Sequence, residues 1–197
     1  MNLPNKLTIL RILIIPFIIL VYFLQGVIDK GMNNLSLYIM GVLFIVASVT
    51  DYLDGHIARK NNIVTTFGKF MDPLADKLLV ITTLVILSNI YYTNNIGGNY
   101  MWMPFWIIII FITRDLVVTS IRIVAISEGS VVAAHWSGKI RTAFTMITLS
   151  YYFFVMPFNN EVINIIGMIM TIIFAVLTIY SMIDYFLKSK DVILKEF

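Results

Sequence analysis

Four aspartates occur in two short segments, and each segment borders an apolar run. The first segment, DYLDGHIARK, begins at Asp51 and follows MGVLFIVASVT; the second, GKFMDPLADK, carries Asp72 and Asp76. Asp51 and Asp54 are spaced i, i+3, and Asp72 and Asp76 are spaced i, i+4, so each pair lies on one face of a helix. Converging carboxylates repel one another, and oxygen ligands favour Mg²⁺, Ca²⁺ or Mn²⁺ over zinc. The pattern therefore indicates a two-metal site of the kind that assists displacement at a phosphate.

Small residues accompany the carboxylates on the same two faces. Gly55 and Ala58 follow Asp51 at i+4 and i+7, and Gly68 precedes Asp72 by four positions. Side chains this small leave room beside the carboxylates for a bulky ligand. The alternative is a set of interface aspartates that only form ion pairs with nearby basic residues, namely Arg59, Lys69 and Lys77.

The composition indicates a membrane protein. Of the 197 residues, 59% are hydrophobic and 13% are charged, and the mean hydropathy is +0.90. Soluble domains are about half apolar and about a quarter charged. The absence of cysteine excludes disulfides and thiolate metal sites. We expect a polytopic membrane protein with one domain over residues 1–197.

Six apolar segments are long enough to cross a bilayer, for which about 20 residues are needed. We predict an all-α bundle of six transmembrane helices over residues 7–28, 35–58, 72–92, 103–126, 136–157 and 162–187. Pro16 falls inside the first helix and is expected to kink it. Pro73 suits the first turn of the third helix, where its missing N–H costs nothing.

Basic residues are distributed unequally between the two sides of this bundle. Thirteen of the 14 Lys and Arg residues fall on the side of the termini, and only Lys30 falls on the other. Because cytoplasmic loops carry an excess of Lys and Arg, we expect both termini and the aspartates to face the cytoplasm.

The two aspartate segments together resemble the signature of the CDP-alcohol phosphatidyltransferase family. That signature is DxxDGxxAR, eight residues, then GxxxDxxxD, and every position is filled here from Asp51 to Arg59 and from Gly68 to Asp76. The six predicted spans agree with the family's fold. The resemblance implies a bacterial cell-membrane enzyme with a polar cleft open to the cytoplasm. It also implies two divalent cations, Mg²⁺ or Mn²⁺, a CDP-diacylglycerol donor, CMP as leaving group and a homodimer among membrane lipids.

The resemblance assigns roles to the signature residues. Asp51, Asp54 and Asp72 would ligate metal, and Asp76 would ligate metal and act as general base for the acceptor hydroxyl.

Further residues would border the nucleotide by the same resemblance. Within the signature they are Gly55, Ala58, Arg59 and Gly68. Near the N-terminus, Asn5 and Thr8 are candidates as well, although Asn5 could instead cap the first helix.

Basic residues of the second half suggest a pocket for an anionic acceptor. Arg114 and Arg122 are spaced i, i+8 on the predicted fourth helix, and Lys139 and Arg141 open the fifth. Guanidinium and ammonium groups suit phosphate. The alternative for each is ordinary positive-inside anchoring, and Asp115 could simply neutralise Arg114. Lys139 and Arg141 point to different sides of a helix.

The segments NLPNKLTILR, FGKFMDPLADK and AAHWSGKIRT resemble the bacterial members of the family whose acceptor is glycerol 3-phosphate. We therefore expect phosphatidyl transfer from CDP-diacylglycerol to glycerol 3-phosphate, and no nucleic-acid partner. Cardiolipin synthases and phosphatidylinositol phosphate synthases of the same family are the alternatives. A cation transporter is a remote one, because its acidic groups would lie near the bilayer midplane on broken or repeated helices.

Overall fold

The computed structural model describes residues 3–30, 34–60, 66–93, 103–127 and 136–189. Within these ranges the chain is helical and contains no strand, so the predicted all-α class is confirmed. The elements are α1 (Leu3–Phe23), α2 (Gln25–Ile28), α3 (Leu35–Lys60), α4 (Thr66–Thr93), α5 (Phe105–Ser127), α6 (Trp136–Phe154), the 3-10 turn η1 (Met156–Phe158) and α7 (Glu161–Lys188).

The six predicted segments fall on the long helices α1 and α3 to α7. The first segment ends earlier than expected, because α1 stops at Phe23 and the single turn α2 follows. The fifth also ends early, at Phe154, where η1 leads to a left-handed residue, Asn159, before α7 begins. Asn160 caps α7 by accepting a hydrogen bond from the backbone N–H of Val162.

The predicted start of the third segment is wrong. α4 begins at Thr66, so Pro73 lies inside the helix and not in its first turn. A proline inside a helix removes one backbone hydrogen bond. The helix starts early because residues 66–71 contain no proline and because Gly68 is buried on the face that continues through Asp72 to Asp76. The whole GxxxDxxxD stripe is therefore helical.

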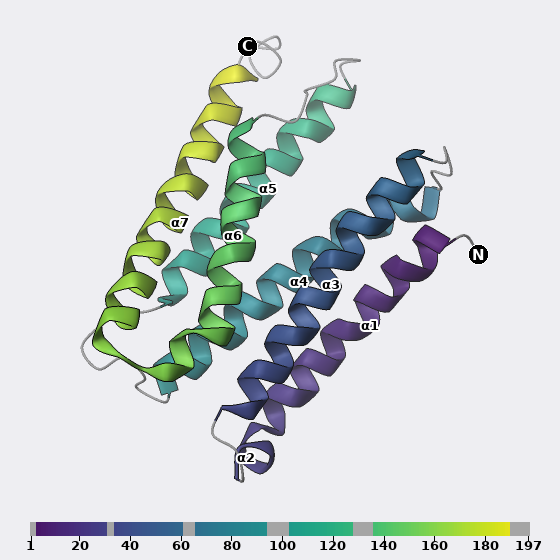
Figure 1. The fold of residues 1–197 in the computed structure, drawn as a ribbon. Helices are drawn as coiled ribbons and strands as arrows, with labels where there is room; N and C mark the ends of the chain where they lie inside the picture. The colour runs from purple at the N-terminus through teal and green to yellow at the C-terminus, as the bar shows by residue number, and fades with distance from the viewer. Residues whose placement is uncertain (1–2, 31–33, 61–65, 94–102, 128–135, 190–197) are drawn as a thin grey trace.

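The long helices form two neighbouring groups (Figure 1). α1 contacts α3 and α4 in one group, and α7 contacts α5 and α6 in the other. α6 and α5 join the groups through contacts with α3 and α4. The start of α1 and the end of α7 lie at the same end of the bundle, together with the end of α3, the start of α4, the end of α5 and the start of α6. We call this end the termini end.

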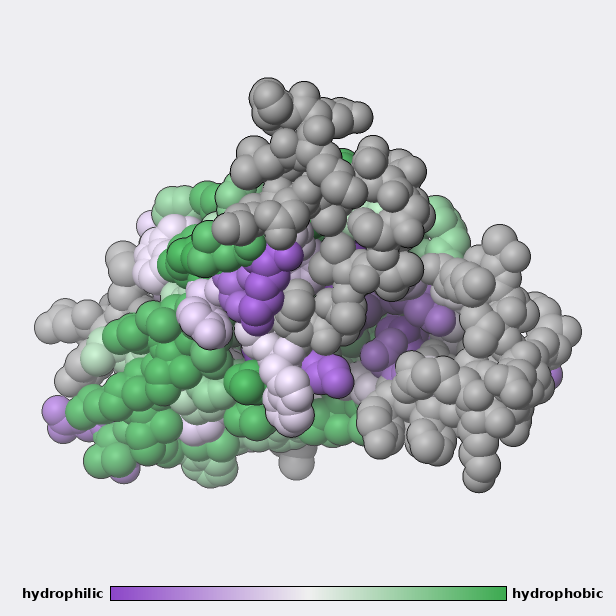
Figure 2. Space-filling view, turned by 90° about the horizontal axis from the view of Figure 1, so that it is seen from above, coloured by the Kyte–Doolittle hydropathy of each residue, from purple (hydrophilic) through white to green (hydrophobic). Residues whose placement is uncertain are grey.

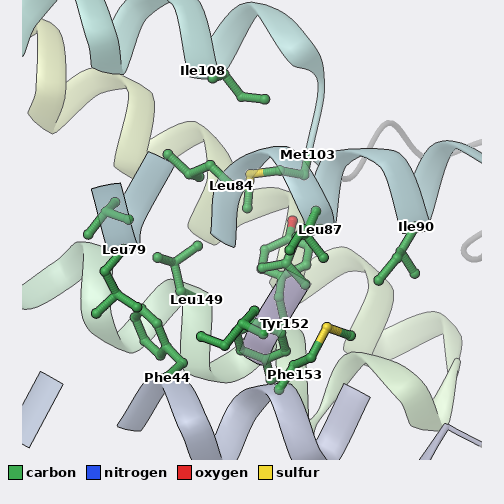
Figure 3. Packing of buried hydrophobic residues seen from close by; sticks show 14 of the residues in the cluster. Phe44, Leu79, Leu84, Leu87, Ile90, Met103, Ile108, Leu149, Tyr152 and Phe153 are labelled. Atoms are coloured by element: carbon green, nitrogen blue, oxygen red, sulfur yellow. The ribbon is translucent and has the colours of Figure 1, made fainter. Parts of the chain in front are cut away.

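An apolar core holds the two groups together (Figure 3). Phe44 of α3, Leu84 and Leu87 of α4, and Tyr152 and Phe153 of α6 are fully buried against one another. The buried Tyr152 backbone carbonyl accepts a hydrogen bond of 2.7 Å from the Tyr91 hydroxyl. A smaller apolar cluster, Val118 and Ile121 of α5 with Tyr185 of α7, lies nearer the termini end.

Two helices of the described chain are long and apolar enough to cross a membrane by length and composition: Asn5–Phe23 within α1, and α7. Their outward faces expose large apolar side chains, among them Phe17 and Leu20 of α1 and Ile169 and Ile172 of α7. Such faces suit a lipid environment.

Gly41 marks a close approach between α3 and α6. A Cβ atom at this position would lie 2.7 Å from the Phe154 ring and 2.8 Å from the Phe153 Cβ. We expect Gly41→Ala to destabilise the protein by about 1–3 kcal/mol, the usual range for overpacking. Thermal unfolding of the purified protein in detergent measures the effect. Gly26→Ala is the matched control, because nothing lies within 4 Å of its added carbon. Equal Tm values for the two variants would contradict the close approach.

Candidate active site

The aspartates of the signature lie on two neighbouring helices. Asp51 and Asp54 are on α3, and Asp72 and Asp76 are on α4. Asp51, Asp72 and Asp76 are half-buried, whereas the side chain of Asp54 lies outside the described part of the chain. α3 and α4 are in contact, so the sequence-predicted stripes are on adjacent helices.

The first helix contacts both of these helices at the aspartates. The Thr8 hydroxyl donates a hydrogen bond of 2.7 Å to Asp72 Oδ1. One turn further along α1, Arg11 Nη1 lies 2.7 Å from Asp51 Oδ1, and its Nε donates to the Ala47 carbonyl at 3.2 Å. Arg11 is fully buried. α1 therefore holds one carboxylate of α3 and one of α4.

On its other side, α4 faces a polar recess. Asp76 and Lys77 line the recess together with Asp115 of α5 and Arg141 of α6. It is small, with a cavity volume of about 20 Å³, and it is partly open to the outside. Figure 2 looks onto the termini end and shows hydrophilic side chains gathered near its middle. Lys77 Nζ also donates to the Thr119 hydroxyl at 2.6 Å, which ties α4 to α5.

Two arginines meet at one carboxylate beside this recess. Asp115 Oδ1 accepts from Arg114 Nη1 at 3.1 Å and from Arg141 Nη2 at 2.9 Å. Arg114 Nη2 also donates to the Ser181 hydroxyl of α7 at 2.7 Å. The Arg141 guanidinium lies 4.7 Å from the centroid of the Phe111 ring, a distance at which a cation is attracted to the ring face.

Some donors of these arginines are not used by the described residues. Arg141 is 7% exposed in its side chain, and neither its Nε nor its Nη1 has a hydrogen-bond partner in the described chain. The same is true of Arg114 Nε. Buried polar groups are normally paired. Arg141 therefore lines a recess that also contains Asp76, and it has two buried nitrogens that no described residue pairs.

The other predicted acceptor residues lie elsewhere. Arg122 is exposed and donates to the Tyr185 hydroxyl at 3.2 Å. Lys139 is also exposed, with its Nζ 5.8 Å from the centroid of the Trp136 ring. Neither residue lines the recess.

Several predicted nucleotide-binding residues lie on the helices that carry the aspartates. Gly55 is half-buried on α3 and Gly68 is buried on α4. Asn5 lies within α1, which begins at Leu3, and so does not act as its N-cap. The remaining two, Ala58 and Arg59, are positions on α3 whose side chains the structure does not describe.

The aspartates offer only oxygen donors, which suits a hard divalent cation. Among the described side chains no three such groups gather closely enough to form a metal site, and one of the four expected ligands, Asp54, is not among them. Asp51 Oδ1 lies 2.7 Å from the fully buried guanidinium of Arg11, and 42% of the Asp51 side chain is exposed.

Sequence reasoning missed three contributions to this region. In the sequence, Arg11 is only one of the basic residues of the termini side, Asp115 is only a neighbour of Arg114, and Ser181 has no predicted role. A signal existed for Arg11: it falls on the same face of α1 as Thr8 and the buried Ile15 and Ile18, where an unpaired charge would be costly.

Comparisons with known proteins agree on one family. Residues 1–180 match the model of the CDP-alcohol phosphatidyltransferases. A relative of Bacillus subtilis named CDP-diacylglycerol–glycerol-3-phosphate 3-phosphatidyltransferase is 44% identical over 76% of this chain and 75% of its own length. Relatives with the same name from Haemophilus influenzae and Escherichia coli K12 are 35% and 32% identical, over 98% and 93% of this chain and 96% and 92% of their own lengths.

Proposed function

This chain belongs to the CDP-alcohol phosphatidyltransferase family, and from that premise we propose that it transfers the phosphatidyl group of CDP-diacylglycerol to glycerol 3-phosphate and releases CMP. The names of the curated relatives support this choice of donor and acceptor. The structural observation that carries it is the recess in which Asp76 lies beside Arg141 with its unused donors.

Arg141 is the residue best placed to bind the phosphate of the acceptor. It lines the recess, and the described residues leave two of its nitrogens without partners. Charge-assisted hydrogen bonds from guanidinium to phosphate are among the strong ones in proteins. Arg114 shares the Asp115 carboxylate with Arg141 and adds positive charge to the same wall. Phosphate bound here would bring the acceptor hydroxyl toward Asp76.

Asp76 would act as general base. The acceptor hydroxyl gives its proton to the Asp76 carboxylate, and its oxygen forms a bond to the phosphorus that carries diacylglycerol. The bond from that phosphorus to the oxygen of the CMP phosphate breaks, so the products are phosphatidylglycerophosphate and CMP. Asp51, Asp54, Asp72 and Asp76 would hold two divalent cations, Mg²⁺ or Mn²⁺, which when bound neutralise charge on the pyrophosphate and on the leaving CMP.

The nucleotide would lie beside the small residues of α3 and α4. Gly55 and Gly68 carry no side chain that would fill the space next to the aspartates. Ala58 and Arg59 continue the α3 face toward the termini end. The cytidine part of the donor would occupy this region, with its lipid chains directed to the apolar outer surface.

We also propose that the six long helices cross the bacterial cell membrane, with the termini end in the cytoplasm. Successive long helices run in opposite directions, and the start of α1 and the end of α7 lie at one end of the bundle (Figure 1). Thirteen of the 14 Lys and Arg residues belong to this side in the sequence. The enzyme would act as a homodimer among membrane lipids, as the family resemblance implies.

A CMP-release assay with purified protein, CDP-diacylglycerol and Mg²⁺ or Mn²⁺ tests the proposed reaction. Glycerol 3-phosphate should give the highest kcat/KM in a panel that also contains glycerol, inositol 1-phosphate and phosphatidylglycerol. Glycerol is the matched control, because it lacks only the phosphate for which Arg141 is proposed. A preference for inositol 1-phosphate or phosphatidylglycerol would assign the chain to another acceptor class of the same family.

A further inference from the structure

We propose that α1 is a positioning element of the metal site: Thr8 and Arg11 hold Asp72 and Asp51 in the arrangement that binds divalent cations. The inference rests on the proposed function, since it concerns the same aspartates. It assigns Thr8 to a carboxylate of the metal site, whereas the family resemblance implies a contact between Thr8 and the nucleotide.

The two residues extend a buried stripe of α1. Ile18, Ile15 and Ile14 are buried on the face of α1 that packs against α3 and α4. Thr8 and Arg11 occupy the next positions of this stripe toward the termini end, and they are 1% and 0% exposed. An apolar residue would bury more favourably at either position unless the polar group had a specific partner. Their partners are the two carboxylates.

Arg11 contacts one full turn of α3. Its Nε donates to the Ala47 carbonyl, and its Nη1 lies against Asp51 Oδ1, four residues further along the helix. The contact with Ala47 fixes the guanidinium against α3, and its Nη1 then forms an ion pair with Asp51 at 2.7 Å. The pair is asymmetric, because Arg11 is fully buried whereas Asp51 is 42% exposed in its side chain. Arg11 therefore contacts the Asp51 carboxylate on its buried side, and the other side of the carboxylate is exposed.

Thr8 holds a carboxylate of α4, that of Asp72, in a similar way. Its hydroxyl donates at 2.7 Å to one oxygen of Asp72. A carboxylate has two oxygens, so Asp72 can accept from Thr8 with one and ligate a cation with the other. Because Thr8 and Arg11 are one turn apart on a single helix, α1 couples the positions of carboxylates on two different helices. Groups that orient metal ligands in this way commonly change metal affinity by about 10- to 100-fold when they are removed.

Binding of Mn²⁺ to the purified protein without substrates tests the proposal, with unbound Mn²⁺ followed by its electron paramagnetic resonance signal. We expect Thr8→Val to weaken Mn²⁺ binding by about 10- to 100-fold, and Thr8→Ser, which keeps the hydroxyl, to retain it. Thr83→Val is the matched control. Thr83 is equally buried, but its hydroxyl donates to the Leu79 carbonyl of its own helix.

Arg11→Lys provides a second variant with unchanged charge. Lysine cannot contact both Ala47 and Asp51 with a planar fork, so we expect weaker Mn²⁺ binding here too. In both variants the Mn²⁺ concentration for half-maximal CMP release should rise in parallel, whereas KM for glycerol 3-phosphate should stay the same. Mn²⁺ binding by Thr8→Val as tight as that of Thr83→Val would overturn the proposal. If the wild type binds Mn²⁺ but releases no CMP with glycerol 3-phosphate, the proposed function fails and the role of α1 still stands on the binding comparison.

Discussion

Replacing Asp72 by asparagine is expected to reduce CMP release by about 1000-fold or more while the protein stays folded. Metal ions supply several kcal/mol of charge stabilisation in a phosphoryl-type transition state, and about 4 kcal/mol corresponds to about 1000-fold in rate. Asparagine removes the charge of this proposed ligand but keeps its volume. Its carbonyl oxygen can still accept the hydrogen bond that Thr8 donates to Asp72 Oδ1. The measurement is kcat at saturating Mg²⁺ or Mn²⁺ together with Tm.

Asp51→Asn serves as the comparison, because it should lose both activity and stability. This change leaves the fully buried Arg11 without its carboxylate. Breaking a fully buried ion pair costs about 3–5 kcal/mol, and the cost is smaller here because Asp51 is partly exposed. Excess EDTA should abolish the activity of the wild type. Full CMP release in EDTA, or by Asp72→Asn, would refute the metal-assisted reaction.

The helices were predictable because their signal is local. Apolar runs of about 20 residues identify long helices without knowledge of their neighbours, and the six predicted segments fall on α1 and α3 to α7. The start of α4 at Thr66 was missed for the same reason: the prediction followed the apolar run, whereas the helix also includes the polar turn around the buried Gly68. Spacing along the chain correctly placed Asp72 and Asp76 on one helix.

The contacts between helices were not predictable in the same way. Periodicity shows which residues share a face, but not how a helix is rotated against its neighbours. Arg11 reaches Asp51, and Arg141 reaches Asp115, across 40 and 26 positions of sequence. Arg114 donates to Ser181, which lies on the last helix. Each of these pairings depends on the packing of two helices, so composition and spacing do not predict the contacts of Arg11 and Asp115.

The second large effect is expected at Arg141. Replacing it by glutamine removes a charge-assisted hydrogen bond, worth about 1.5–3 kcal/mol, from the proposed acceptor site. That loss corresponds to about a 10- to 150-fold increase in KM for glycerol 3-phosphate. The same loss would instead lower kcat if the contact tightens only during reaction. KM for CDP-diacylglycerol should hardly change, because the donor would be held on the side of α3 and the start of α4. Asp115 keeps its contact with Arg114 in the variant, so the fold should survive.

Lys139→Gln is the matched control for this prediction, since Lys139 is on the same helix and carries the same charge. It is exposed over Trp136 and does not line the recess, so its replacement should affect KM for glycerol 3-phosphate far less than that of Arg141. If Arg141→Gln instead raised KM equally for both substrates, the role of Arg141 would be only to join α6 to Asp115 of α5. An effect of Lys139→Gln as large as that of Arg141→Gln would mean that the acceptor binds nearer the start of α6 than the recess beside Asp76.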